Sequence, residues 1–213
     1  MNTRLKGLYP ITPPNFTSDK DYLEKCYLVI NSGINIFQFR APNFSSRQKK
    51  YFLNEIYAYC LKANVQLIIN NDLDLVKKYD GAGLHIGKSD ITLKEARKKL
   101  GKEKIIGFSC GSDVYDMERL NYSNNLSYLS IGAMFHTSTK RNVSMLNEKT
   151  IMFYMKNKLI PVCIIGGIDK HTISDVIKFN PDMVAISNGI FGEDMDNITD
   201  IMMYLIKSIN DKK

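Results

Sequence analysis

The sequence repeats one pattern along its length: a short run rich in β-branched residues, followed by an amphipathic stretch. Eight such runs occur, and no low-complexity linker divides them. Strands that alternate with helices predict parallel βαβ units. Two architectures fit, an open doubly wound sheet and a closed barrel, and eight unbroken repeats favour a single (β/α)8 TIM barrel. The predicted strands are residues 7–12, 35–40, 65–70, 81–87, 104–109, 127–133, 160–166 and 182–187.

The length and composition agree with one soluble globular domain. The 213 residues are enough for a small barrel, so we expect residues 1–213 to form one TIM-barrel domain. The net charge of +7 admits nucleic acid, anionic membranes or phosphorylated small molecules as partners. No basic helix or aromatic–basic platform supports nucleic-acid binding, and no apolar run has membrane-spanning length. The sequence leaves the oligomeric state open, a homo-oligomer included.

The four cysteines indicate a reducing compartment. They are far apart, none forms a C-x-x-C pair, and each lies among apolar residues. This pattern is typical of reduced thiols packed as small hydrophobic groups. Together with the absence of an apolar leader, it predicts a cytoplasmic protein. The cysteines are Cys26, Cys60, Cys110 and Cys163.

Two of the predicted helices carry a capping-box signal at their start. Ser45 with Gln48, and Thr92 with Glu95, have the spacing at which a hydroxyl accepts from the third helical N–H while the longer side chain reaches back. We therefore expect helices to begin directly after Ser45 and Thr92.

The second predicted strand carries the most informative alternation. In the run 34–40, Phe37 and Phe39 lie on one face, and Ile36, Gln38 and Arg40 lie on the other. If the phenylalanines face the helices, Gln38 and Arg40 point into the barrel. A buried arginine needs a partner. The partner is either a structural carboxylate or an anionic ligand, and this strand alone does not decide between them.

Polar residues and glycines collect at the carboxyl ends of the other strands, where barrel active sites lie. A glycine pair follows strand seven and Ser-Asn-Gly follows strand eight, which are the usual positions of a barrel phosphate site. For the glycine pair alone, a tight turn is the simpler explanation. The strand-end residues are Asn70–Asn71–Asp72, Gly87–Lys88–Ser89–Asp90, Ser109, Gly166–Gly167 and Ser187–Asn188–Gly189.

The segment after strand six has the composition of an anion-binding loop. Residues 135–141 contain three consecutive hydroxyl side chains and then two cations. A solvated polar loop is the alternative, but the position at a strand's carboxyl end favours ligand binding. His136 is the histidine expected in the barrel mouth, whereas His85, inside strand four, is expected to pack in the core. Asp90 is either a helix-start carboxylate or a Mg²⁺ ligand beside a pyrophosphate.

In order along the chain, these segments resemble the thiamine phosphate synthase family, whose members are (β/α)8 barrels. The resemblance runs from Leu8 to Phe191, with its motifs at the expected strand ends. The segments that carry it are Gln38–Arg40, Leu67–Asn70, Gly83–Gly87 with Asp90, Ile106–Ser109, Gly132 with Thr137–Lys140, Ile165–Ile168 and Val184–Ser187.

The resemblance implies a transferase of thiamine biosynthesis with Mg²⁺ as cofactor and small phosphorylated substrates as partners. It would join 4-amino-2-methyl-5-hydroxymethylpyrimidine diphosphate to 4-methyl-5-hydroxyethylthiazole phosphate and release pyrophosphate. By position, the pyrimidine diphosphate would be held by Gln38, Arg40, Asn70, Ser109 and Lys140, of which Arg40, Ser109 and Lys140 would be catalytic. The phosphate loop would be lined by Thr137, Ser138 and Thr139, and the thiazole phosphate would be bound by Gly167, Ile186 and Ser187.

The chain departs from the family pattern in the half that would bind diphosphate and metal. Pro42 stands where the motif Gln-x-Arg-x-Lys has lysine, and Asn71 stands where the family has a magnesium-binding aspartate. One positive and one negative charge are lost together. The implied metal ligands are Asp90 and the amide of Asn71, with Asp72 next to it as a further candidate. Outside this half, Ala133 and His136 replace residues that are usually proline.

Two other functions remain open at this point. The related thiazole tautomerases bind the thiazole phosphate without diphosphate machinery and use a histidine. The absence of the family's lysine at position 42 and aspartate at position 71 favours this alternative. However, the expected histidine position is Gly111, and Thr-Ser-Thr-Lys is closer to the synthase pattern. His136 is the other candidate for proton transfer. A barrel that binds thiamine precursors without turnover is the third hypothesis.

Overall fold

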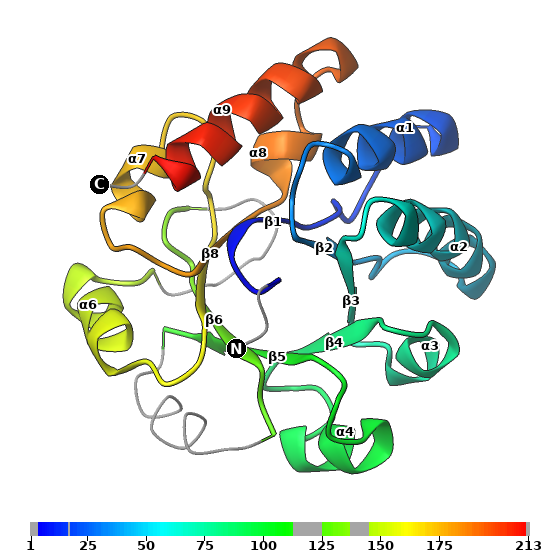
Figure 1. The fold of residues 1–213 in the computed structure, drawn as a ribbon, viewed down its shortest axis with the longest axis horizontal. Coiled ribbons are helices and arrows are strands. Elements are labelled where there is room, and N and C mark those ends of the chain that lie inside the picture. The colour runs from blue at the N-terminus through cyan, green and yellow to red at the C-terminus, as the bar shows by residue number, and fades with distance from the viewer. Residues whose placement is uncertain (1–3, 17, 113–124, 137–144, 212–213) are drawn as a thin grey trace.

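The computed structural model describes residues 4–16, 18–112, 125–136 and 145–211, and these form a (β/α)8 barrel (Figure 1). Eight parallel strands make one sheet in the order β1-β8-β7-β6-β5-β4-β3-β2. A bridge between Ile11 and Gln38 closes the sheet into a barrel. The strands are β1 Gly7–Pro10, β2 Ile36–Phe39, β3 Gln66–Asn70, β4 Gly83–Ile86, β5 Ile106–Gly111, β6 Tyr128–Ile131, β7 Val162–Ile165 and β8 Met183–Ile186.

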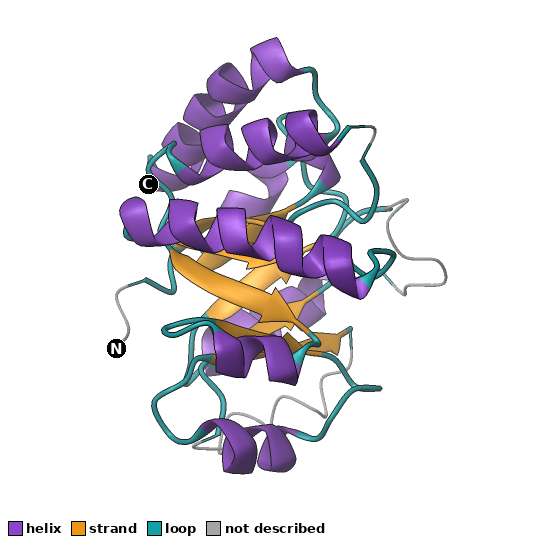
Figure 2. Ribbon diagram, turned by 90° about the vertical axis from the view of Figure 1, so that its right-hand side faces the viewer, coloured by secondary structure: helices purple, strands orange, loops and turns teal. Residues whose placement is uncertain are grey.

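The helices surround this barrel, and Figure 2 shows the strands enclosed between them. No described helix has both the length and the apolarity needed to cross a membrane. The helices are α1 Asp19–Ile30, α2 Ser46–Lys62, α3 Leu73–Lys78, α4 Leu93–Leu100, α6 Glu148–Asn157, α7 Ile173–Ile177, α8 Asn188–Phe191 and α9 Ile198–Asn210, with a 3-10 turn at Met195–Asn197.

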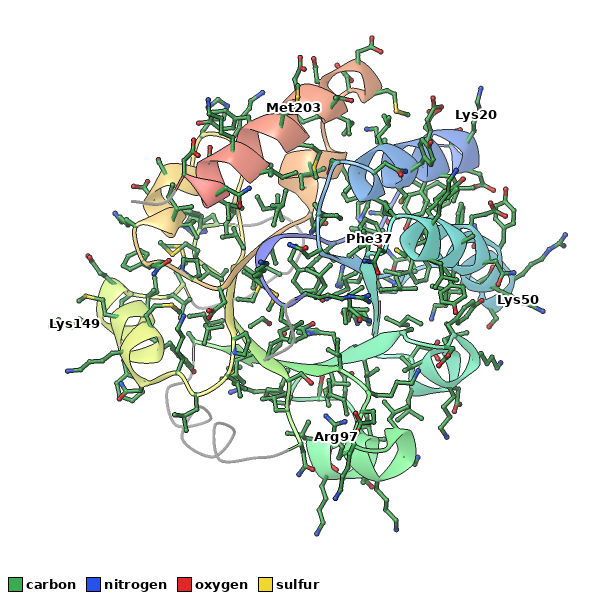
Figure 3. The ribbon with its side chains drawn as sticks, viewed as in Figure 1. Lys20, Phe37, Lys50, Arg97, Lys149 and Met203 are labelled. Atoms are coloured by element: carbon green, nitrogen blue, oxygen red, sulfur yellow. The ribbon has the colours of Figure 1, made fainter. Side chains whose placement is uncertain are left out.

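The alternation in β2 has the predicted orientation. Phe37 and Phe39 belong to the large apolar layer between strands and helices, and Figure 3 shows Phe37 between the barrel and its outer helices. Ile36 belongs instead to the smaller cluster inside the barrel. Successive side chains of a strand point to opposite faces, so Gln38 and Arg40 share the inner face with Ile36. The hydrophobic pattern of one strand therefore directs two polar residues into the barrel.

Both predicted capping boxes are present. Ser45 accepts from the backbone N–H of Gln48 at the start of α2, and Gln48 accepts from the backbone N–H of Ser45 in return. Thr92 and Glu95 make the same pair of bonds at the start of α4. The strand boundaries are shifted slightly: β5 continues to Gly111 through a register irregularity between Ser109 and Gly111. This irregularity lies at the carboxyl end of the barrel, which is where polar residues collect.

All four cysteines are buried free thiols. Burial raises the pKa of the Cys60 thiol to about 12, and it raises the pKa of Cys26 well above its usual value. Such thiols stay protonated near neutral pH and react poorly, because the thiolate is the nucleophile. We expect the native protein at pH 8 to show no fast reaction with a disulfide reagent such as DTNB, and the protein unfolded in urea to release four equivalents.

The same shift gives the pH dependence a sign. Above about pH 9 the unfolded Cys60 thiol ionises while the folded thiol does not, so unfolding becomes more favourable. The free energy of unfolding should therefore fall as the pH rises from about 9 to about 12. A native protein that titrates rapidly with DTNB would contradict both expectations.

Candidate active site

The carboxyl ends of the strands open into a cavity of about 800 Å³. Residues predicted from six different strand ends meet in its lining, and His136 joins them. Thr137, Ser138, Thr139 and Lys140 lie outside the described residues. The predicted residues that line the cavity are Gln38, Arg40, Asn70, Asn71, Asp90, Ser109, Gly167, Ile186 and Ser187.

Arg40 is the clearest sign that this cavity receives an anion. Its backbone is fixed by Thr12, whose hydroxyl donates to the Arg40 carbonyl at 2.9 Å and accepts from the Arg40 N–H at 2.7 Å. Its Nη1 is buried, and no described residue gives this nitrogen a hydrogen-bond partner. Burial lowers the pKa of the guanidinium below its usual value, although arginine keeps its charge in proteins. No described carboxylate pairs with this guanidinium nitrogen, and an anionic ligand fits it.

The floor of the cavity contains a chain of hydrogen bonds that crosses the barrel interior. Gln38 Nε2 donates to the Tyr9 hydroxyl at 2.7 Å, and the Tyr9 and Tyr128 hydroxyls are 2.7 Å apart. Burial raises the pKa of both phenols far above the usual value, so both stay neutral. The two rings meet edge to face, with their centroids 5.8 Å apart. This packing holds the amide of Gln38 at the base of the cavity.

The chain continues to the other side of the barrel through His85. Its Nδ1 lies 3.0 Å from the Tyr128 hydroxyl, and its Nε2 lies 3.0 Å from Ser109 Oγ. Ser109 Oγ in turn lies 3.1 Å from Ser130 Oγ. When Tyr128 donates to Nδ1, the neutral ring carries its proton on Nε2 and donates to Ser109. The Ser109 proton is then directed toward Ser130 or a ligand in the cavity.

A second group of polar residues lines the side of the cavity that contains the candidate metal ligands. Asn71 Nδ2 donates to Asp90 Oδ1 at 3.0 Å, and the backbone N–H of Gly87 donates to Asp90 Oδ2 at 2.7 Å. Asn71 adopts a left-handed backbone with φ of 61°, which asparagine tolerates better than most residues. Asp72 instead caps α3, accepting from the Leu75 N–H at 3.1 Å. Asn71, and not Asp72, is therefore the residue that contacts Asp90.

The oxygen ligands on this side suit a hard cation that takes most of its ligands from substrate phosphates and water. The described residues contain no group of three His, Cys, Asp or Glu side chains placed to hold a metal. Mg²⁺ is usually bound through one or two carboxylates, with substrate phosphates and water completing its shell. Asp90 with the amide oxygen of Asn71 matches that requirement, because Mg²⁺ bound in this way needs no third protein ligand.

The ends of β7 and β8 form the glycine-lined side of the cavity. Gly167 has φ of 66°, and an added Cβ would lie 2.4 Å from the His136 carbonyl oxygen and 2.8 Å from Phe135 Cβ. Only glycine fits this close approach of two backbones. Ser187 lies directly before α8, and its side chain makes no capping bond to that helix. Backbone and hydroxyl groups thus face the cavity here with little side-chain bulk.

Several lining residues were missed by sequence reasoning. His85 is buried as expected, yet both ring nitrogens are hydrogen-bonded and the ring lines the cavity. Ser130 also lines the cavity, and the buried Tyr9 and Tyr128 lie beneath it. Each is a polar group within a predicted apolar strand, and this could have marked it. Lys49 gave no such signal, because a lysine near the start of an amphipathic helix is ordinarily a surface residue. It lines the cavity from α2.

The fold and the cavity together define a class of protein. A (β/α)8 barrel whose carboxyl-end cavity combines a glycine-lined backbone with a guanidinium nitrogen that no described residue pairs is typical of barrel enzymes that bind phosphorylated ligands. A family model described as thiamine monophosphate synthase matches residues 8–190. The chain belongs to the thiamine monophosphate synthase family.

Individual relatives agree with this assignment. The chain is 33% identical over 189 residues to a thiamine-phosphate synthase of Clostridium botulinum, covering 88% of this chain and 91% of the relative. It is 32% identical over 188 residues to one of Persephonella marina, covering 88% and 89%. Among solved structures, a thiamine phosphate pyrophosphorylase of Pyrococcus furiosus superposes with a TM-score of 0.83 at 21% identity, covering 98% of both chains. That last similarity supports the fold.

Proposed function

We propose that this cavity joins 4-amino-2-methyl-5-hydroxymethylpyrimidine diphosphate to 4-methyl-5-hydroxyethylthiazole phosphate. As a member of its family, the chain is a thiamine-phosphate synthase, a transferase of thiamine biosynthesis. The observation that carries the substrate assignment is the buried Nη1 of Arg40, which no described residue pairs, in one cavity with the glycine-lined Gly167 side. Two phosphorylated substrates need two such places.

The roles of the residues follow from their positions and from the family resemblance. Arg40 would neutralise the diphosphate, while Gln38, Asn70 and Ser109 would hydrogen-bond to the pyrimidine half. The thiazole phosphate would lie against the carboxyl ends of β7 and β8, at Gly167, Ile186 and Ser187. Thr137, Ser138, Thr139 and Lys140 keep the phosphate-loop and diphosphate-binding roles that the resemblance implies for them.

The reaction that fits these groups is a dissociative substitution. The bond between the methylene carbon and the diphosphate oxygen breaks, and both electrons leave with pyrophosphate. The electron-rich aminopyrimidine supports the resulting carbocation, and the thiazole nitrogen lone pair then forms the new C–N bond. No proton has to be transferred for this balance. Arg40 stabilises the charge that develops on the leaving group, which is the larger part of such catalysis.

Mg²⁺ is the metal that we propose for the Asp90 side of the cavity. Asp90 and the amide oxygen of Asn71 would hold it, together with diphosphate oxygens and water. Its chemical contribution would be to neutralise charge on the departing pyrophosphate. The reduced thiols and the phosphorylated substrates are in keeping with a cytoplasmic location.

The decisive experiment is a product assay on the purified protein. We expect thiamine phosphate, detected by oxidation to fluorescent thiochrome, when both substrates and Mg²⁺ are present, and none when EDTA or a single substrate is used. No product from protein that melts cooperatively would contradict the proposal. Interconversion of thiazole phosphate tautomers without product would indicate the tautomerase instead. Against that alternative, residue 111 is a glycine and offers no proton-transfer group.

A further inference from the structure

Lys49 is a cation of the cavity that comes from the body of a helix and not from a strand end. It lies near the start of α2 and contributes to the cavity lining together with Arg40 and Pro42. Its neighbour Lys50 is exposed and extends from the outer side of the same helix (Figure 3). Two adjacent lysines of α2 thus have different surroundings, and only Lys49 reaches the cavity.

The contact that Lys49 makes is weak and leaves its ammonium available. Its Nζ lies 3.9 Å from Asp72 Oδ2, which is beyond hydrogen-bonding distance. The two side chains are 29% and 33% exposed, so water screens the pair. An ammonium has three N–H donors, and no hydrogen bond at such a distance satisfies any of them. The ammonium can therefore move toward a stronger anion at little cost.

Asp72 is better fixed than its partner. Its Oδ1 accepts the Leu75 N–H at the start of α3, so the carboxylate is tied to a helix end. Asp72 also follows Asn71, the residue that contacts Asp90. The Lys49 ammonium, next to Asp72, therefore lies near the side of the cavity that holds Asp90 and Asn71.

The loop after β2 supplies no further cation to this side. Arg40 is followed by Ala41 and Pro42, both in the cavity lining and both uncharged. Among the described lining residues, the lysines and arginines are Arg40, Lys49 and Lys88. A diphosphate ester carries more charge than one guanidinium neutralises, so a lysine on the same side as Arg40 would add to the compensation that the bound anion requires.

From this arrangement we propose that Lys49 is a substrate-binding residue for the diphosphate group. The inference rests on the proposed function only in the identity of the ester, since any diphosphate would meet the same cations. On binding, the Lys49 ammonium leaves Asp72 and donates to a phosphate oxygen.

The test compares Lys49→Ala with the matched control Lys50→Ala. Binding of inorganic pyrophosphate with Mg²⁺ is measured by calorimetry, and KM is measured separately for each substrate. We expect Lys49→Ala to raise the Kd for pyrophosphate and the KM for the diphosphate substrate by about tenfold or more, as for loss of one charged contact. The KM for thiazole phosphate should be unchanged, and Lys50→Ala should match the wild type in every measurement.

A second variant separates ligand binding from a merely structural ion pair. Asp72→Asn removes the charge but keeps an oxygen that caps α3. If Lys49 only stabilised the fold through Asp72, both variants would lower the melting temperature alike, and neither would weaken pyrophosphate binding selectively. We expect Asp72→Asn to retain pyrophosphate binding that Lys49→Ala loses. Wild-type pyrophosphate affinity in Lys49→Ala would overturn the proposal. Lys49-dependent pyrophosphate binding without thiamine phosphate formation would overturn the proposed function alone.

Discussion

Replacing Arg40 with alanine should lower kcat/KM for the diphosphate substrate by about a hundredfold to a thousandfold, as expected for loss of a desolvated charged contact. The buried Nη1 has no described partner in the protein, so the contact that is lost is the one to the ligand. The strand itself should survive, because Thr12 holds the Arg40 backbone and not its side chain. We expect an unchanged or higher melting temperature, since an uncompensated buried charge is removed.

The control for Arg40 is a second partly buried arginine with a structural role. Within the described part of the chain, Arg97 on α4 (Figure 3) donates its hydrogen bonds to backbone carbonyls. Arg97→Ala should lower the melting temperature and leave both KM values unchanged, the opposite of Arg40→Ala. The carbonyls that accept from Arg97 belong to Gly101, Lys102, Lys104 and Asn125.

A lysine at position 40 tests geometry against charge. Arg40→Lys keeps the positive charge but loses the planar fork that binds two phosphate oxygens at once. We expect it to recover only part of the lost kcat/KM. A normal KM for the diphosphate substrate in Arg40→Ala would show that the cavity does not bind diphosphate through this residue.

Local periodicity was sufficient to predict the barrel and part of its interior. Eight apolar runs alternating with amphipathic stretches predicted the strand count, and the alternation around Phe37 and Phe39 predicted that Arg40 points inward. These features depend on neighbours one or two residues apart in sequence. The same holds for the capping boxes at Ser45 and Thr92, where all the interacting groups lie within four residues.

The hydrogen-bonded chain beneath the cavity could not be predicted in this way. Tyr9 and Tyr128 are separated by 119 residues, and His85 and Tyr128 by 43. Their contact depends on the register of strands around the closed barrel, and a shift of one residue would turn each side chain to the other face. The position of Lys49 could not be predicted for a similar reason, because its approach to the cavity depends on how α2 packs against the barrel.

The family resemblance added residue roles that the geometry supports unevenly. It brought Arg40, Asn71 and Asp90 into one site, and the structure places all three in one cavity. The chain departs from the family pattern at Pro42 and at Asn71, in the half that we propose to bind diphosphate and metal. We propose that Lys49 supplies the positive charge that is missing at position 42. For position 71, a single carboxylate with an amide is the donor set that remains.

Replacing Gly107 with alanine should destabilise the protein by about 3 kcal/mol, at the upper end for an overpacked core. Gly107 lies in β5 beside β6, and its new Cβ would lie 2.1 Å from Cζ and 2.4 Å from Oη of Tyr128. Tyr128 is fully buried and bonded to both Tyr9 and His85, so its ring has no free direction in which to move. Any movement of the Tyr128 ring that relieves the clash must therefore break the series of hydrogen bonds that ends at Ser109.

The control for this prediction is Tyr128→Phe in the unmodified chain. It keeps the ring and removes only the hydroxyl, so it should cost about 1–3 kcal/mol, from the partners left unsatisfied at Tyr9 and His85. Urea denaturation measures both variants. In the double variant Gly107→Ala with Tyr128→Val, the smaller side chain makes room for the new methyl group. Its destabilisation should then be less than the sum for Gly107→Ala and Tyr128→Val measured singly, because both changes act on one contact. An unchanged urea midpoint in Gly107→Ala, or strict additivity in the double variant, would show that the β5–β6 contact does not hold Tyr128 in place.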